Sequence, residues 1–161
     1  MKTIQHTTSI QLYDSIEELI DADAFLLSEA RSATQFAYAP YSNFQVAAIG
    51  KLENGEVVMG TNQENASYPA GLCAERSMLA TASSVHPGIA VTTIAITYNN
   101  LKGSSDKPAS PCGICRQSLA EHTQRFKLPI KLILSGMEGP VQVIENCLDL
   151  LPLSFGADDL A

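Results

Sequence analysis

The sequence contains no run of 18 or more apolar residues, and no basic segment leads into an apolar one near its start. A membrane-spanning helix needs about 20 apolar residues, and a secretory signal peptide has a charged leader before its apolar stretch. We therefore expect neither, and we expect a cytoplasmic protein. Thiols stay reduced in the cytoplasm, so the four cysteines favour metal binding or catalysis over a disulfide framework.

Positive charge is also scarce. Ten Lys and Arg residues stand against 17 Asp and Glu residues, which gives a net charge of −7, and the basic residues form no cluster along the chain. Proteins that follow a phosphate backbone need a concentrated cationic face. We therefore do not expect a long nucleic acid as a partner, and a small neutral or weakly charged molecule is favoured.

The 161 residues, 45% of them apolar, are enough for one substantial core. Apolar side chains at helical spacing predict one or two helices over 14–38, behind a possible short strand at 9–13. Two strand-like stretches flank Asn54-Gly55, a dipeptide that favours hairpin turns. Further helices are predicted after Cys73 and Cys112, strands at 89–98 and 130–135, a weak strand at 141–144 and a short helix near 146–151. This order predicts an α/β fold, a three-layer α/β/α sandwich with a mixed sheet opened by a β-hairpin.

Three of the four cysteines stand at the openings of two predicted helices: Cys73 in "GLCAERSML", and Cys112 and Cys115 in "SPCGICRQS". Side chains three apart in one helical turn converge. A catalytic zinc site takes three protein ligands and leaves its fourth position to water, so we favour catalytic zinc. A redox dithiol, or a structural zinc with Cys147 as the fourth ligand, are the alternatives. Cys147 lies in the apolar segment "VIENCLDLL", which is more typical of a buried, inert thiol.

Glu75 follows Cys73 by two residues, and such side chains point to different faces of a regular helix. Cys73 must therefore have non-helical geometry if both are to face one ion. Three thiolates around a dication leave one negative charge, and Arg76 and Arg116 are candidates to hydrogen-bond the sulfurs. The histidines could in principle supply a metal ligand, but we interpret them as solvated or capping residues: His6, His86 and His122. We interpret three tyrosines as packing residues: Tyr13, Tyr38 and Tyr98.

Five segments together resemble the cytidine deaminases, specifically the small homotetrameric type that acts on free nucleosides. They are "APYSNFQVAA" at 39–48, "NQENASY" at 62–68, "CAER" at 73–76, "PCGICRQ" at 111–117 and "LLPLSFGADDL" at 150–160. The cysteine motifs alone match only the wider zinc deaminase superfamily. We expect a catalytic domain over residues 24–161, behind an N-terminal extension of residues 1–23. The family commonly has glycine at the position of Ala47, so we expect some crowding near the pocket.

The resemblance implies one Zn²⁺ per subunit, held by Cys73, Cys112 and Cys115, with Glu75 as the proton carrier. It implies hydrolytic deamination of cytidine and 2′-deoxycytidine to uridine and 2′-deoxyuridine, with release of ammonia, as a step of pyrimidine salvage. It also implies the following substrate contacts: Phe44, Asn62, Glu64, the backbone N–H of Ala74, the carbonyl of Ser110, and Tyr68 and Phe155 in the pocket of a neighbouring subunit. Because residues two apart on a strand share one face, we expect Asn62 and Glu64 to reach one sugar.

Two other functions stay open at this point. One is deamination of a modified cytosine nucleoside or nucleoside antibiotic, because the sequence does not define the wall that faces the base. The other is a non-catalytic zinc-binding interaction module, against which Glu75 argues, since a structural site has no use for a buried proton carrier. The loop at 99–110 borders Cys112, and we expect it to shape access to that residue.

Overall fold

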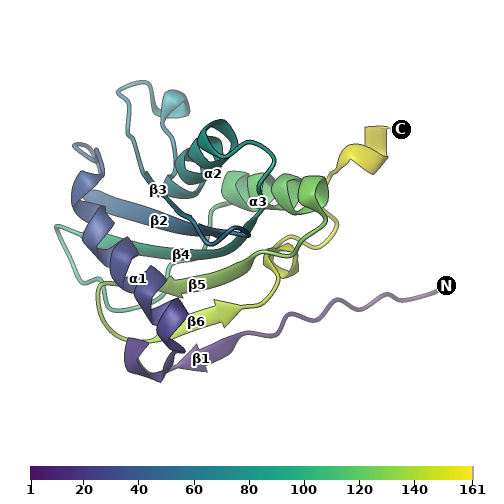
Figure 1. The fold of residues 1–161 in the computed structure, drawn as a ribbon, viewed down its shortest axis with the longest axis horizontal. Coiled ribbons are helices and arrows are strands. Elements are labelled where there is room, and N and C mark those ends of the chain that lie inside the picture. Colours follow the sequence, from purple (N-terminus) through teal and green to yellow (C-terminus); the bar gives the residue numbers. More distant parts are fainter. Residues whose placement is uncertain (161) are drawn as a thin grey trace.

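The protein is a six-stranded mixed sheet with helices on both faces (Figure 1). The computed structural model describes residues 1–160. The sheet order is β1-β6-β5-β4-β2-β3. Its strands are β1 (Gln11–Tyr13), β2 (Phe44–Leu52), β3 (Val57–Thr61), β4 (Val91–Asn100), β5 (Lys131–Ser135) and β6 (Val141–Ile144). The helices are α1 (Asp21–Ala33), α2 (Ala74–Val85) and α3 (Gly113–Phe126). The predicted three-layer α/β/α architecture is confirmed.

The strands β2 and β3 form the predicted hairpin, with Asn54-Gly55 at its turn. Gly55 has a φ of +89°, which explains the glycine at this position. β4 pairs in parallel with β5, and α3 connects the two strands, whereas the other strand pairs are antiparallel. The start of α3 therefore lies beyond the carboxyl end of β4, where ligands commonly bind in open α/β sheets.

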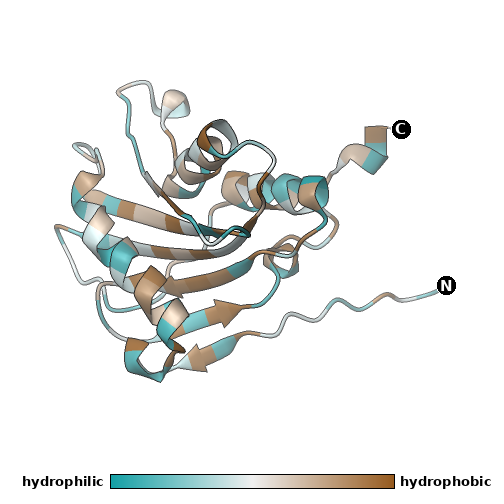
Figure 2. Cartoon of the chain, in the orientation of Figure 1, coloured by the Kyte–Doolittle hydropathy of each residue, from teal (hydrophilic) through white to brown (hydrophobic). Residues whose placement is uncertain are grey.

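Each face of the sheet buries its own apolar layer. On one face, α1 contributes Leu26 and Leu27, which pack with Ile133 of β5. On the other face, Met78 of α2 and Leu119 of α3 pack with the strands. Since both faces are covered, the central strands carry long apolar stretches, which are brown in Figure 2, with polar residues between them. Ala47 packs in the apolar layer between α1 and the sheet. Any crowding from its methyl group would therefore occur on the α1 face of the sheet.

Two predicted helices are shorter than expected. The segment over 14–38 forms α1 flanked by 3-10 turns at Ile16–Glu18 and Thr34–Phe36, because Leu19 is extended and interrupts the helix. The segment near 146–151 forms a 3-10 helix at Cys147–Leu150, which begins where the Asn146 side chain accepts a hydrogen bond from the Leu148 N–H.

The N-terminal residues contact the sheet. β1, the predicted short strand, pairs antiparallel with β6 at the edge opposite the hairpin. At the start of α1, the carboxylate of Asp23 accepts hydrogen bonds from the ammonium of Lys131, both at 2.7 Å. The domain boundary at residue 23 stays a prediction. Within residues 1–160, no helix combines the length and the apolar character that a bilayer crossing requires.

Candidate metal centre and its cavity

Two helix N-termini bring three sulfurs together. Cys73 is the N-cap of α2 and Cys112 is the N-cap of α3, both with extended backbone, while Cys115 lies in the first turn of α3. The non-helical geometry predicted for Cys73 is therefore present. The Sγ atoms of Cys73 and Cys112 lie 3.7 Å apart, and those of Cys112 and Cys115 lie 3.5 Å apart. All three sulfurs lie within 4.8 Å of one another.

These distances fit a zinc ion. Zn–S bonds of about 2.3 Å in tetrahedral array place two sulfurs about 3.8 Å apart. Among residues 1–160, the cluster of side chains that could hold a metal ion consists of these three cysteines and includes no His, Asp or Glu. Cys147 lies elsewhere, buried, with its Sγ 3.3 Å from the Thr123 hydroxyl. The structure therefore does not support Cys147 as a fourth ligand, and the group consists of three cysteines, the number that a catalytic zinc site takes from the protein.

The cluster has the electrostatics of a cation site. Hydrogen bonding with Cys115, and then with Cys112, lowers the pKa of Cys73 to about 6 despite partial burial. The positive charge of Arg76 acts in the same direction. The hydrogen bond with Cys73, together with burial, raises the pKa of Cys115. Cys73 thus loses its proton more readily than Cys115, and a bound dication would favour the thiolate form of its ligands.

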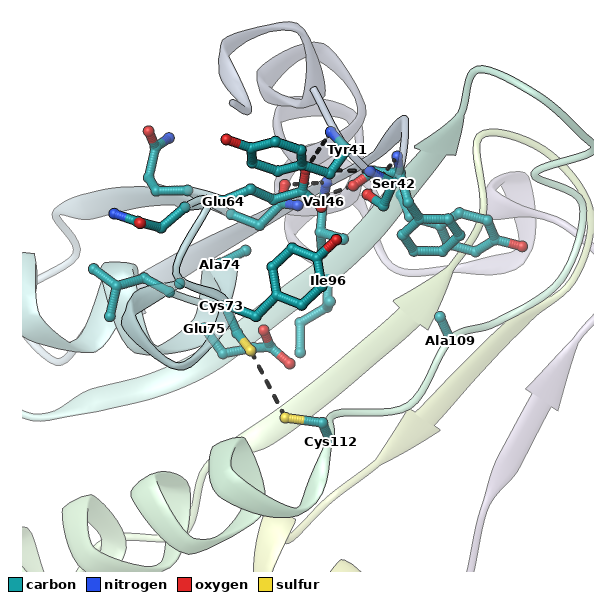
Figure 3. A pocket seen from close by; sticks show the side chains of 18 of the residues that line it. Tyr41, Ser42, Val46, Glu64, Cys73, Ala74, Glu75, Ile96, Ala109 and Cys112 are labelled. Atoms are coloured by element: carbon teal, nitrogen blue, oxygen red, sulfur yellow. Dashed lines mark hydrogen bonds between the residues drawn. The ribbon is translucent and has the colours of Figure 1, made fainter. Parts of the chain in front are cut away.

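Glu75 lies beside the sulfurs but outside their group. Its side chain is 5% exposed, and Figure 3 shows its carboxylate next to Cys73, with Cys112 opposite. Desolvation by burial raises the pKa of this carboxyl. The residue is not a member of the three-ligand group. Its position therefore agrees with the prediction that it faces the metal without coordinating it.

A cavity of about 590 Å³ opens next to the sulfurs, within the size range of small-molecule sites. Its lining includes Cys73, Cys112 and Glu75, and six of the predicted substrate residues: Phe44, Asn62, Glu64, Tyr68, Ala74 and Ser110. Phe155 does not line it and is 57% exposed at the end of the chain. The cavity thus brings together the metal centre and most of the predicted substrate contacts.

The far wall carries Asn62 and Glu64, which lie just beyond β3 and not on it, because that strand ends at Thr61. The Asn62 amide accepts a hydrogen bond from the Val46 N–H at 2.7 Å and donates one to the Phe44 carbonyl at 2.9 Å. Backbone hydrogen bonds from the Asn62 N–H to the Val46 carbonyl and from the Glu64 N–H to the Tyr38 carbonyl continue past β3. The Asn62 side chain adds to them, and both residues lie in one cavity.

Glu64 is held by the segment before β2. Its Oε2 accepts hydrogen bonds from the backbone N–H groups of Tyr41 at 2.9 Å and Ser42 at 3.2 Å. Hydrogen bonding to the Ser42 side chain is the main cause that lowers the pKa of Glu64. The carboxylate is therefore ionised and fixed in orientation at the rim of the cavity.

The two predicted supporting arginines differ. The Arg116 side chain donates to the carbonyls of Pro111, at 2.8 Å, and Leu150, at 3.0 Å, so it holds the backbone before Cys112. Arg76 lines a second cavity between α2 and α3. Hydrogen bonds from either guanidinium to a ligand sulfur stay a prediction.

Two residues have roles that the sequence did not predict. Tyr98, interpreted only as packing, lines the cavity and stacks on Phe44 with ring centroids 4.5 Å apart. Tyr98 and the cavity residue Ile96 share a face of β4, but only the structure shows that this face lines the cavity. His122 is not solvated or capping: it is 6% exposed, and its Nε2 accepts a hydrogen bond from the Val91 N–H. His86, at the end of α2, pairs with Glu56 at 2.7 Å.

Cysteines from two helix starts, with a buried carboxyl beside them, define the class of zinc-dependent deaminases, in which a Glu that is not a ligand carries protons. Residues 20–127 match the family described as the cytidine and deoxycytidylate deaminase zinc-binding region. The chain belongs to this family.

Relatives over most of the chain agree with that assignment. A cytidine deaminase of Halalkalibacterium halodurans is 38% identical over 137 residues, which cover 84% of this chain and 95% of the relative. A cytidine deaminase of Mycobacterium tuberculosis is 37% identical over 135 residues, with 84% and 90% covered. The crystal structure of a cytidine deaminase from Burkholderia pseudomallei matches with a TM-score of 0.70 and 37% identity, over 81% of this chain and 97% of its own.

Proposed function

We propose that the protein converts cytidine and 2′-deoxycytidine to uridine and 2′-deoxyuridine by zinc-dependent hydrolytic deamination. The observation that carries this proposal is the position of Glu75, a buried carboxyl that lines a small-molecule cavity beside three sulfurs of zinc-binding geometry. A structural zinc site has no use for such a group. Family membership supports the same reaction, because the relatives named above are cytidine deaminases.

In this proposal Cys73, Cys112 and Cys115 hold the zinc, which as a Lewis acid makes water a nucleophile at neutral pH. Glu75 moves the protons, and burial raises its pKa, which makes the carboxyl a better proton acceptor than an exposed one. Its carboxylate accepts a proton from the water whose oxygen adds to C4 of the cytosine ring. Glu75 delivers this proton to N3, then takes the proton of the new C4 hydroxyl and passes it to the amino group. The C4=O bond forms as the C4–N bond breaks, and ammonia leaves.

The other cavity residues orient the nucleoside. Ala74 is the first residue of α2, so its N–H has no partner within the helix and can face the base, as can the Ser110 carbonyl. Asn62 and the ionised Glu64 are the candidates to bind the sugar hydroxyls, while the Phe44 ring packs on the nucleoside. These roles agree with the places of all five residues in one cavity.

The proposal includes a homotetramer with shared active sites, a cytoplasmic location and a role in pyrimidine salvage. Tyr68 is 76% exposed and Phe155 57% exposed, so neither side chain is buried in this chain's core. In this proposal Phe155 reaches a neighbouring subunit's pocket, and Tyr68, which also lines the cavity of its own chain, extends to the neighbouring subunit as well. Specific activity should therefore fall on dilution at the concentration where sedimentation detects monomers, and monomers with full activity would contradict shared sites.

Ammonia release from a panel of cytosine nucleosides tests the reaction, with zinc content measured on the same samples. We expect the wild type to release ammonia from cytidine and 2′-deoxycytidine, and Glu75→Gln to lose a factor of roughly 10² to 10⁴ in kcat while it keeps its zinc. Faster turnover of a modified cytosine nucleoside would favour that alternative substrate. Equal, negligible rates for both zinc-loaded proteins would favour a non-catalytic zinc module.

A further inference from the structure

The loop over residues 101–112 connects β4 to α3 and ends at the ligand Cys112. It has no regular secondary structure, and loops of this length in compact domains are usually functional. Its first seven residues are exposed apart from Ser105, which is 8% exposed. A buried polar residue in the middle of an exposed loop shows that the loop is attached to the protein at this point.

Two hydrogen bonds make this attachment. The Ser105 hydroxyl accepts a hydrogen bond from the Asn100 N–H at 2.8 Å, which ties the loop to the end of β4. The Ser105 carbonyl accepts one from the Glu138 N–H at 3.2 Å, which ties the loop to the turn between β5 and β6. The loop and this turn leave the same end of the sheet (Figure 1).

The turn has glycine where the loop lies against it. A Cβ atom at Gly136 would come 2.0 Å from the Ser105 carbonyl oxygen, and one at Gly139 would come 2.4 Å from that of Asp106. These oxygens belong to the backbone and cannot rotate away as a side chain could. Gly139 also needs glycine for its φ of +79°, but Gly136 has no positive φ, so the close approach of the loop accounts for it.

The turn between β5 and β6 is itself attached to α1. The Nε of Arg31 donates to the Gly136 carbonyl at 3.0 Å, and its Nη2 donates to the Ser135 hydroxyl at 3.3 Å. The Ser135 hydroxyl donates to the Pro140 carbonyl at 3.1 Å, which closes the turn. Contacts therefore run without a gap from α1 through the turn to the middle of the loop.

We propose that Ser105, Gly136 and Arg31 are positioning residues that hold Cys112 and the Ser110 carbonyl in place for zinc and substrate. Cys112 is the exposed ligand of the three. Four loop residues lie between Ser105 and Ser110, and six lie between Ser105 and Cys112. Arg116 holds the Pro111 carbonyl next to Cys112, and Ser105 is the second point at which this loop is attached. A loop released at Ser105 would depend on Arg116 alone and would let this ligand move more freely relative to Cys73, the N-cap of α2. The part of this inference that concerns Ser110 rests on the proposed function, whereas the part that concerns zinc does not.

The test compares Ser105→Ala with Ser104→Ala in the full-length, zinc-loaded protein. Ser104 is the exposed neighbour, so both variants lose a serine hydroxyl, but only Ser105→Ala loses the hydrogen bond from the Asn100 N–H and leaves this part of the loop held by the Ser105 carbonyl alone. Zinc transfer to a chromophoric chelator should be about tenfold faster for Ser105→Ala, since changes in the groups that orient metal ligands typically weaken metal binding 10- to 100-fold. KM for cytidine should rise more than kcat falls. Amide exchange at Glu138 should become faster, and Ser104→Ala should match the wild type.

Gly136→Ala should act in the same direction and more strongly, because the added Cβ pushes against the loop backbone. If it does not fold, Ser105→Ala decides alone. A Ser105→Ala protein with a lower melting temperature but wild-type zinc release and wild-type KM would overturn the proposal and leave a structural role. A wild type that binds zinc but deaminates no cytosine nucleoside would refute the proposed function, and the comparison of zinc release would still test the positioning of Cys112.

Discussion

The two helix starts that hold the sulfurs are fixed in different ways. At α2 the helix lies directly on β3, because Gly60 has no side chain: a Cβ there would come 2.2 Å from the backbone nitrogen of Met78. At α3 the backbone before Cys112 is held by hydrogen bonds from Arg116, and the Cys112 side chain is exposed. We infer that one half of the metal centre depends on close packing and the other on polar contacts, so the two halves should respond to different substitutions.

Gly60→Ala should have the largest effect on the packed half. The added methyl group would overlap the backbone of α2, which cannot move without moving Cys73 and Glu75. Overpacking of this kind costs about 3 kcal/mol. Denaturant unfolding should show that loss, and zinc content and ammonia release should fall with it.

The control for this glycine lies at the start of the other helix. A Cβ at Gly113 would have no atom within 4 Å, so Gly113→Ala should change stability by less than about 0.5 kcal/mol. If Gly60→Ala were as stable as Gly113→Ala, the packed and the hydrogen-bonded half would not differ as we infer.

Arg116→Ala tests the polar half. It removes the hydrogen bonds to the Pro111 and Leu150 carbonyls, so the backbone before Cys112 loses its support. We expect zinc affinity to fall about tenfold in competition with a chelator. Arg125→Ala is the control on the same helix, since Arg125 lies over the Phe126 ring and not at the loop. Equal zinc affinities of the two variants would show that Arg116 does not act on the metal centre.

The elements that carry both halves were easier to predict from the sequence than the contacts that hold them. The hairpin followed from Asn54-Gly55, and the helix starts followed from "CAER" and "PCGICRQ", because local turn and helix signals are contained in neighbouring residues. The three ligands followed from cysteine spacing. Local patterns of this kind also gave the fold class.

The polar half depends on partners far apart in the sequence. Arg116 reaches Leu150 across 34 positions, and Ser105 meets Glu138, which no local pattern indicates. Asn62 was expected on a strand, but its side chain bonds the β2 backbone after the strand has ended. Such contacts arise only when packing has set the distances between elements, so spacing and periodicity could not reveal them.

Tyr98→Leu should have a smaller effect, confined to substrate binding. The Phe44 ring stacks on Tyr98 at an interplanar angle of 13°, so loss of the tyrosine ring would leave the Phe44 ring without its backing. Aromatic pairs contribute about 0.5 to 1.5 kcal/mol beyond area burial, which corresponds to a rise in KM for cytidine of up to about tenfold. Tyr98→Phe keeps the ring and should keep the KM. A KM unchanged in Tyr98→Leu would show that the stack does not orient the nucleoside.

The smallest predicted effect is on the pH dependence of stability. It concerns His122, which lies on α3 two turns beyond the ligand Cys115. Burial, and then the charge of Arg125, lowers the pKa of His122, so the folded protein keeps its imidazole neutral and able to accept the Val91 N–H. In the unfolded chain the histidine titrates near 6.5. Its contribution to stability is therefore complete above that pH and is lost as the pH falls toward the lower folded pKa.

The melting temperature of the wild type should decline more steeply below pH 6.5 than that of His122→Gln, which keeps an acceptor but cannot be protonated there. The cysteines are the same in both proteins, so they do not account for a difference between the two. If the melting temperatures of both proteins declined in parallel with falling pH, His122 would not link α3 to β4 through a neutral imidazole.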